Sequence, residues 1–163
     1  MQGLVYRTAK QTESDPDLYC LSDETVDRMG EVISVDGWEL GNFKHNPIAL
    51  FNHHSDKIVG SWKNVRVDGK RLLGHLVLAD EGTSPDVDTA RKLRQQGHLR
   101  SVSVGFRAID KQPLTKDADP YFGPFKYLRQ ELVECSLVAV PANPNAHQVA
   151  RSLGAILDRK SVV

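Results

Sequence analysis

The chain has 163 residues, 40% of them hydrophobic, which predicts a single domain over residues 1–163 with its own core. Its 21 basic and 21 acidic residues leave no basic excess to neutralise phosphates, so nucleic acid is not an expected partner. No segment approaches the roughly 18 continuous apolar residues of a membrane span, and the first residues hold no signal-like apolar run, so no membrane association is expected.

The first strong local pattern lies at residues 62–79, which predict a β-hairpin. Asp68 and Gly69 supply the two residues of a tight turn between two apolar-rich arms. A helix is predicted next, over residues 84–97. Ser84 is its N-cap, Pro85 its first helical residue and Gly97 its stop signal. Its apolar stripe is narrow, so we expect it on the surface of a sheet structure.

The remaining elements are mainly strands. Residues 98–109 alternate apolar and polar side chains, which is typical of a strand with one buried face. Residues 111–126 hold three prolines among charges and predict a surface loop. A second strand follows over residues 127–140, and residues 145–158 have the spacing of a short helix. The pattern predicts a mainly β protein with a few helices.

Cysteine and histidine residues limit the possible chemistry. Cys20 and Cys135 lie far apart in apolar surroundings without CxxC spacing, which predicts buried, reduced thiols and a reducing compartment. The six histidines show neither the paired spacing of a structural zinc site nor that of a metalloprotease helix, so no metal is expected.

Three separated strand segments hold the parts of a serine nucleophile system. His53 ends an apolar run, Ser103 lies on the polar face of its strand and Glu134 interrupts an apolar strand. Each residue alone also fits a plain structural role, as an exposed strand-end histidine, a solvent-facing serine or an edge glutamate. No GxSxG turn is present, so an α/β-hydrolase is disfavoured.

The same segments resemble a known family. The stretches ALFNHHSDKIVGSW, SVSVGF and LVECSLVAVPANPNA, in this order, resemble those of the HK97-type prohead proteases, serine peptidases of tailed phages, and the likeness runs over about residues 23–146. It implies that Ser103 is the nucleophile and His53 the catalytic histidine. His54 stands where the family usually has an acid, so the third member stays open between Glu134, which we favour, and His54.

The resemblance implies a closed β-barrel-like core of the herpesvirus-protease type. It also implies a serine endopeptidase that needs no cofactor. This enzyme would cleave scaffold protein, or a scaffold-like segment of the major capsid protein, and also itself, inside the assembling prohead in the host cytoplasm. The alternative is an inactive capsid-assembly or scaffold-binding module of the same fold. The oligomeric state stays open.

The catalytic hypothesis predicts a geometry. Ser103, His53 and Glu134 should converge, because the nucleophile must reach its base and the base its orienting carboxylate. His54 should point away from Ser103, because adjacent residues of an extended segment face opposite sides.

Overall fold

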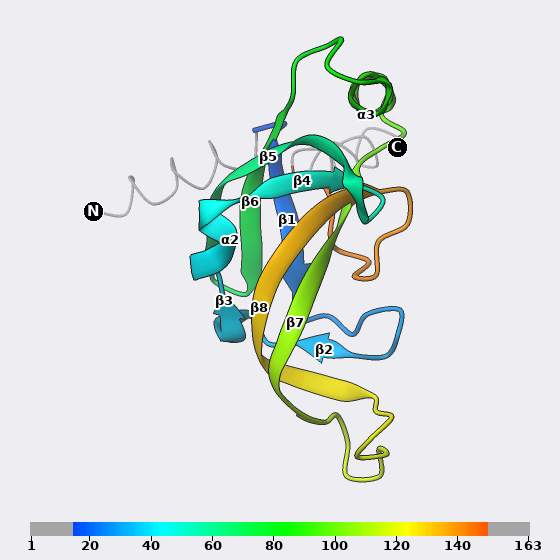
Figure 1. The fold of residues 1–163 in the computed structure, drawn as a ribbon. Coiled ribbons are helices and arrows are strands. Elements are labelled where there is room, and N and C mark those ends of the chain that lie inside the picture. Colours follow the sequence, from blue (N-terminus) through cyan, green and yellow to red (C-terminus); the bar gives the residue numbers. More distant parts are fainter. Residues whose placement is uncertain (1–14, 150–163) are drawn as a thin grey trace, which may run out of the picture.

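The computed structural model describes residues 15–149 and shows one curled sheet with two short helices (Figure 1). The sheet has eight strands. In chain order the elements are β1 (Leu18–Asp23), β2 (Val32–Ile33), the 3₁₀-helix η1 (Val35–Gly37), β3 (Trp38–Glu39), α2 (Gly41–His45), β4 (Ile48–Phe51), β5 (His54–Asp68), β6 (Arg71–Leu78), α3 (Pro85–Gln95), β7 (Ser101–Pro113) and β8 (Phe125–Val138). The prediction of a mainly β protein with a few helices is confirmed. None of the described helices is long and apolar enough to cross a membrane.

β8 is the centre of the strand pairing. It pairs antiparallel with β7 along nearly its whole length, and parallel with β4, β2 and β3 at successive positions. From β4 the sheet continues through β5 and β6 to β1 at its far edge. The last strand of the described chain therefore joins segments that precede it by up to about a hundred residues.

The expectation of a closed barrel is wrong, because β1 and β7 do not pair with each other. A short segment, residues 146–148, lies between them at one end. There the Cys20 N–H donates to the His147 carbonyl at 3.1 Å and the Val102 N–H to the Ala146 carbonyl at 3.0 Å. The chain turns just before this segment, at residues 143–145, so the gap stays open at the other end. The sheet is thus a half-barrel.

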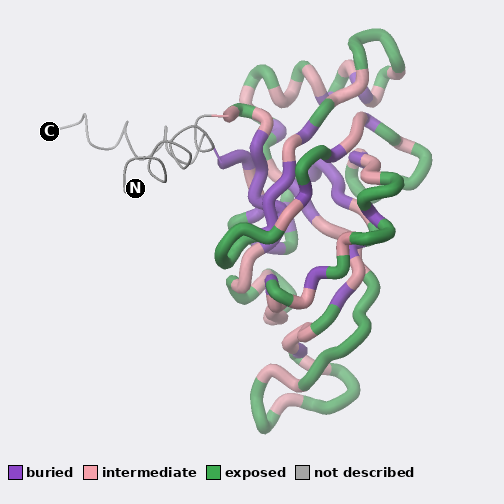
Figure 2. Tube along the Cα trace, turned by 90° about the vertical axis from the view of Figure 1, so that its left-hand side faces the viewer, coloured by how far each residue is buried: buried purple, intermediate pink, exposed green. Residues whose placement is uncertain are grey.

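The core lies inside the curled sheet, where the buried residues gather (Figure 2). Its largest fully buried side chains include Trp62, Tyr19, Leu21, Leu72, Leu132 and Leu137. The Trp62 indole N–H donates to the Cys135 carbonyl at 3.0 Å, which satisfies a polar group that burial would otherwise leave unpaired. Both cysteines are free and buried, as predicted.

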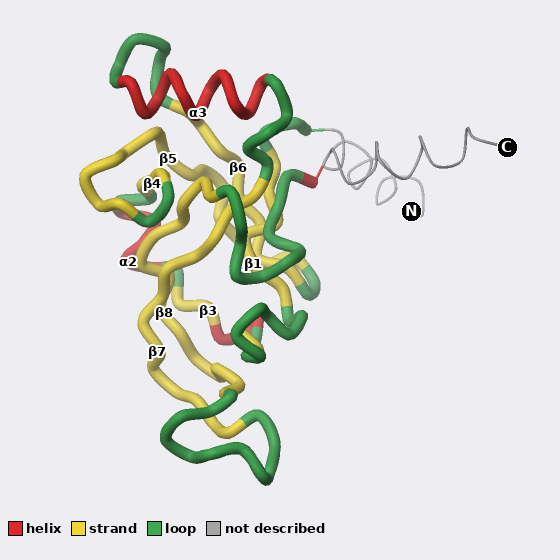
Figure 3. The backbone as a smooth tube through the Cα atoms, turned by 90° about the vertical axis from the view of Figure 1, so that its right-hand side faces the viewer, coloured by secondary structure: helices red, strands yellow, loops and turns green. Residues whose placement is uncertain are grey.

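The distal part of the β7–β8 pair projects from the body as an arm (Figure 3). Its tip is the loop 114–124, shorter than the predicted loop 111–126 because β7 continues to Pro113 and β8 begins at Phe125. Tyr121 and Phe122 are strongly exposed at this tip.

The predicted hairpin is confirmed as β5 and β6, but its turn lies one residue later than expected. Asp68 pairs with Arg71, so the turn residues are Gly69 and Lys70, and Gly69 has the positive φ of 59°. Glycine adopts this conformation without steric cost, so the turn is placed at Gly69. The position of the turn then fixes the register of the β5–β6 pair.

The predicted helix is confirmed as α3. The Ser84 hydroxyl accepts a hydrogen bond from the Val87 N–H at 3.2 Å, as an N-cap should, and the helix ends at Gln95, two residues before the expected Gly97. The buried residues Val87 and Ala90 form its inner face. Of the predicted helix over 145–158, the residues up to 148 form a turn and isolated bridges instead, and residues 150–158 lie outside the described part.

Candidate active site

His53 lies in a two-residue turn between β4 and β5. Phe51 pairs with His54, which leaves Asn52 and His53 as the turn residues, with φ angles of 54° and 60°. Left-handed backbone is unfavourable for residues other than glycine, by about 1 kcal/mol each, and such strain often marks functional positions. His53 therefore lies in a turn. The expectation that His53 and His54 belong to one extended segment is wrong.

This turn is fixed to β8 through its backbone. The Asn52 N–H donates to the Leu137 carbonyl at 2.9 Å, and the His53 N–H donates to the Ser136 hydroxyl at 3.1 Å. The position of the His53 ring thus depends on the β4–β8 pairing as well as on its own turn.

The His53 ring contacts the carboxylate of Glu134. Nδ1 of His53 lies 2.5 Å from Oε1 of Glu134, while the Ser136 hydroxyl donates to Oε2 of the same carboxylate at 2.7 Å. The His53 side chain is 44% exposed and that of Glu134 only 16%. A proton on Nδ1 directed at the carboxylate leaves Nε2 with the lone pair of a neutral ring, which is the atom needed to accept a proton.

Gly105 makes room for this carboxylate. It lies opposite Glu134 in the β7–β8 pair, and a Cβ atom at residue 105 would come within 2.3 Å of Oε1 of Glu134. The absence of a side chain at Gly105 therefore permits Glu134 to lie across β7.

Ser103 lies on the strand next to this cluster. It pairs with Ser136, two residues before Gly105, so its side chain shares the sheet face of Glu134 and Ser136. Ser103 is 7% exposed, and its hydroxyl makes no hydrogen bond within residues 15–149. The structure thus brings His53 and Glu134 into contact and places Ser103 at the neighbouring strand position, without a hydrogen bond from Ser103 to His53. His54 is exposed at the start of β5 and makes no such contact with Glu134.

The chain matches a known protein family over most of its length. The family model of the caudovirus prohead serine proteases matches residues 17–158 of the chain. The chain belongs to this family. The match includes all three stretches in which the sequence resemblance lies. No curated protein and no solved structure matches the chain, so the likeness to the herpesvirus-protease fold stays a prediction.

Ser136 is a further residue of the candidate site in this member of the prohead protease family, and it was not predicted from the sequence. It is completely buried, and its hydroxyl links the Glu134 carboxylate to the backbone of His53. A signal was present in the sequence, because residues 134 and 136 of one strand must point to the same side. Two polar residues at that spacing within an apolar strand indicate a shared polar contact.

The cysteines are unsuited to replace serine as the nucleophile of this protease. Burial, followed by the charge of Glu134, raises the pKa of the Cys135 thiol well above its ordinary value. Burial, followed by the charge of Asp23, raises the pKa of Cys20 to about 11. Because the thiolate is the reactive form, both groups are inert at neutral pH.

The stretch PANPN after β8 has a structural role. Asn143 and Asn145 donate through their side-chain amides to the two carboxylate oxygens of Asp23, at 2.9 and 2.7 Å. Burial alone would raise the pKa of Asp23, but the hydrogen bonds from Asn143, Asn145 and Thr25 outweigh it and lower this pKa. These bonds hold the segment that follows β8 against the end of β1.

Proposed function

We propose that this chain is a serine endopeptidase of phage head maturation, in which Ser103 is the nucleophile, His53 the general base and Glu134 the orienting carboxylate. The contact between His53 Nδ1 and Glu134 Oε1 carries the proposal, because it fixes the ring in the tautomer that a base requires. Membership of a family of prohead serine proteases supports the class of reaction.

In this mechanism Oγ of Ser103 attacks the carbonyl carbon of the scissile peptide bond, while Nε2 of His53 takes the hydroxyl proton. The C–N bond then breaks as His53 returns that proton to the leaving amine, and an acyl-enzyme remains. Water, deprotonated by His53, hydrolyses the acyl ester and restores Ser103. Glu134 stabilises the imidazolium present at each proton transfer. The hydrogen bond between nucleophile and base commonly tightens only when substrate binds.

The proposed substrates are scaffold protein or the scaffold-like segment of the major capsid protein, together with the chain itself. Cleavage would occur inside the assembling prohead, within the cytoplasm of the bacterial host. The family's prohead association supports these assignments. The competing candidate is a catalytically inactive capsid-assembly or scaffold-binding module. The Glu134 carboxylate in the space above Gly105 favours the enzyme, because a binding module has no need of a carboxylate held against a histidine ring.

A fluorophosphonate probe tests the proposal, because it reacts covalently with an activated serine. We expect the full chain to be labelled, the Ser103→Ala and His53→Ala variants to remain unlabelled, and the matched control Ser101→Ala, on the same strand face, to retain labelling. Mass spectrometry of the labelled peptide identifies the modified serine. Absence of labelling in the wild-type chain, together with no cleavage of any peptide, would favour the inactive module.

A further inference from the structure

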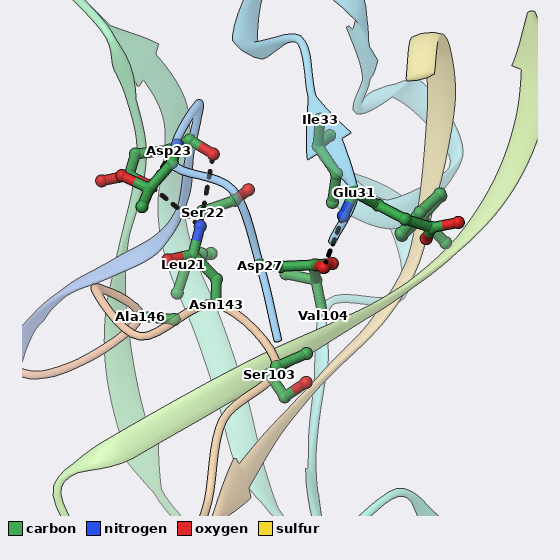
Figure 4. A pocket seen from close by; sticks show the side chains of 13 residues that line it. Leu21, Ser22, Asp23, Asp27, Glu31, Ile33, Ser103, Val104, Asn143 and Ala146 are labelled. Atoms are coloured by element: carbon green, nitrogen blue, oxygen red, sulfur yellow. Dashed lines mark hydrogen bonds between the residues drawn. The ribbon is translucent and has the colours of Figure 1, made fainter. Parts of the chain in front are cut away.

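A pocket occupies the open end of the gap between β1 and β7. It is lined by residues of both strands, by the segment 24–31 and by the segment 142–146, and Ser103 and Val104 form part of its wall (Figure 4). Its apolar lining includes Leu21, Ile33, Val104, Phe106 and Ala146. The pocket therefore lies at the edge of β7, next to the backbone of Ser103, whose hydroxyl is on the opposite sheet face from the Val104 side chain.

The backbone edge of β7 is available for pairing at this pocket. The Val102 N–H donates to the Ala146 carbonyl, so it faces away from β8. Backbone groups of alternate residues in an antiparallel pair face the same way, so those of Val104 also point away from β8. They lie past Ala146, where the short segment begins. An extended peptide that enters the gap would continue the line of this short segment and add a strand to β7.

A buried hydroxyl in the wall of the pocket lacks a partner. Ser22 is completely buried, and its Oγ has no hydrogen-bond partner within the described residues. Ser22 lines the pocket. Since buried polar groups are normally hydrogen-bonded, this hydroxyl indicates a place where a polar group of a ligand would be accepted.

The rim of the pocket is acidic. Asp23, Asp27 and Glu31 all line it, and Figure 4 shows the two aspartates and Glu31 on the segments that face the strand carrying Ser103. Their hydrogen-bond partners are neutral: asparagine amides, the backbone N–H groups of Thr25, Met29 and Glu31, and the Tyr127 hydroxyl. None of the three carboxylates forms an ion pair with a side chain of residues 15–149.

The charge of Glu31 and Asp27 also contributes to the pKa of a neighbouring group. Burial, followed by the hydrogen bond to Glu31 and by the charges of Glu31 and Asp27, raises the pKa of Tyr127 to about 12. Negative charges disfavour the phenolate, so the region around the pocket favours a cation.

We propose that this pocket binds a lysine or arginine side chain of the substrate, located within two residues of the scissile bond. The inference rests on the proposed protease function and adds its specificity. The alkyl part of the basic side chain packs on the apolar lining, while its cation lies beside the carboxylate of Asp27, with Asp23 and Glu31 on either side along the rim (Figure 4). The peptide backbone pairs with the edge of β7 at Val104.

A mixture of synthetic peptides of random sequence, incubated with the full chain, measures this specificity. Mass spectrometry of the products gives the residue frequencies on either side of each cleaved bond. We expect lysine and arginine to be enriched at one fixed position within two residues of that bond. Cleavage without such enrichment, or with enrichment of acidic residues there, would overturn the proposal and leave the protease function intact. No cleavage and no fluorophosphonate labelling would instead contradict the protease function.

Two substitutions then test the carboxylates. Asp27→Asn keeps a carbonyl oxygen that accepts from Met29 and Glu31, and Glu31→Gln keeps an acceptor for Tyr127, so each removes mainly charge. For a matched peptide pair with lysine or norleucine at the enriched position, we expect Asp27→Asn to lower the kcat/KM ratio of lysine to norleucine by roughly 5-fold and Glu31→Gln to lower it by a smaller factor. The control substitutions Asp117→Asn and Glu81→Gln, at exposed acidic residues that do not line the pocket, should leave this ratio unchanged. An unchanged ratio in both rim variants would show that the carboxylates do not select the substrate.

Discussion

The His53 ring and the Glu134 carboxylate meet at 2.5 Å although 81 residues separate them in the chain. His53 comes from the β4–β5 turn and Glu134 from β8, and the parallel pairing of β4 with β8 brings the two elements together. The pair is thus a product of sheet topology and does not depend on a flexible loop.

We expect Glu134→Gln to lower kcat by at least about 100-fold with little change in KM, because in the proposed mechanism the carboxylate stabilises an imidazolium that exists only during proton transfer. Steady-state kinetics on a cleaved peptide measure both constants. Glu131→Gln is the control, since Glu131 lies on the same strand but bonds Arg107 and Asn42 instead. A normal kcat in Glu134→Gln combined with a low kcat in His54→Ala would make His54 the third catalytic residue.

Ser136 should act through Glu134 and His53. We expect Ser136→Ala to lower kcat by about 10-fold and the free energy of unfolding by about 1–2 kcal/mol, because a buried hydrogen-bond link is lost. Urea unfolding gives the stability, and kinetics in the wild-type and Glu134→Gln backgrounds give the coupling. The effect on kcat should shrink when Glu134 is already replaced. An equal effect in both backgrounds would mean that Ser136 acts independently of the carboxylate.

A side chain at residue 105 should displace Glu134. Gly105→Ala puts a methyl group where the carboxylate lies, so the contact with His53 must lengthen, and displacements of about 1 Å can cost roughly 100-fold in rate. We expect a fall of this size in kcat, measured on a peptide substrate, while the fold is retained by circular dichroism. Gly41→Ala is the matched control, because no atom lies within 4 Å of a Cβ built there. Full activity in Gly105→Ala would contradict the proposed role of Glu134.

Acid should weaken the attachment of the PANPN stretch. The pKa of Asp23 is lowered in the folded state, so its carboxylate stabilises the fold above the unfolded value of about 3.9, and this stabilisation is lost as the pH falls through the folded value. Urea midpoints between pH 7 and pH 3 measure this loss. We expect Asp23→Asn to be less stable than wild type at pH 7 and to lose less stability in acid. A pH dependence in Asp23→Asn identical to that of the exposed control Asp117→Asn would refute this link.

Both thiols should be protected in the folded protein. Because Cys20 and Cys135 are buried with raised pKa values, we expect iodoacetamide at pH 8 to modify neither in the native chain and both after unfolding in urea. Intact-mass spectrometry counts the adducts. Rapid native modification of Cys135 would show that the strand carrying Glu134 opens readily.

Local signals in the sequence predicted local structure well. Ser84 and Pro85 define the start of α3, and the apolar arms around Gly69 define the β5–β6 hairpin. Long-range pairing left no such signal. The gap between β1 and β7 depends on where the segment 146–148 begins and ends. No periodic pattern of apolar residues in the sequence indicates these limits.

The same limit applies to the candidate site. His53, Ser103 and Glu134 were predicted because three stretches of the sequence resemble those of a known family. The contact of Glu134 with His53, in contrast, depends on the tight turn at Asn52 and His53 and on the space above Gly105. Ser136 resembles an ordinary buried serine until its partners are known. Turn conformation and cross-strand register therefore carry the information that residue types alone lack.

The central place of β8 also sets an order of events during synthesis. Ser103 and His53 leave the ribosome before Glu134 and Ser136 do. Pairing in this part of the sheet is complete only once β8 has emerged, because β8 pairs with β2, β3, β4 and β7. Sheets that depend on such distant pairings fold slowly, because loop closure precedes the gain from contacts. A nascent chain consequently cannot bring His53, Ser103 and Glu134 together until β8, which ends at Val138, has emerged, so the proposed active site assembles only after that point of translation.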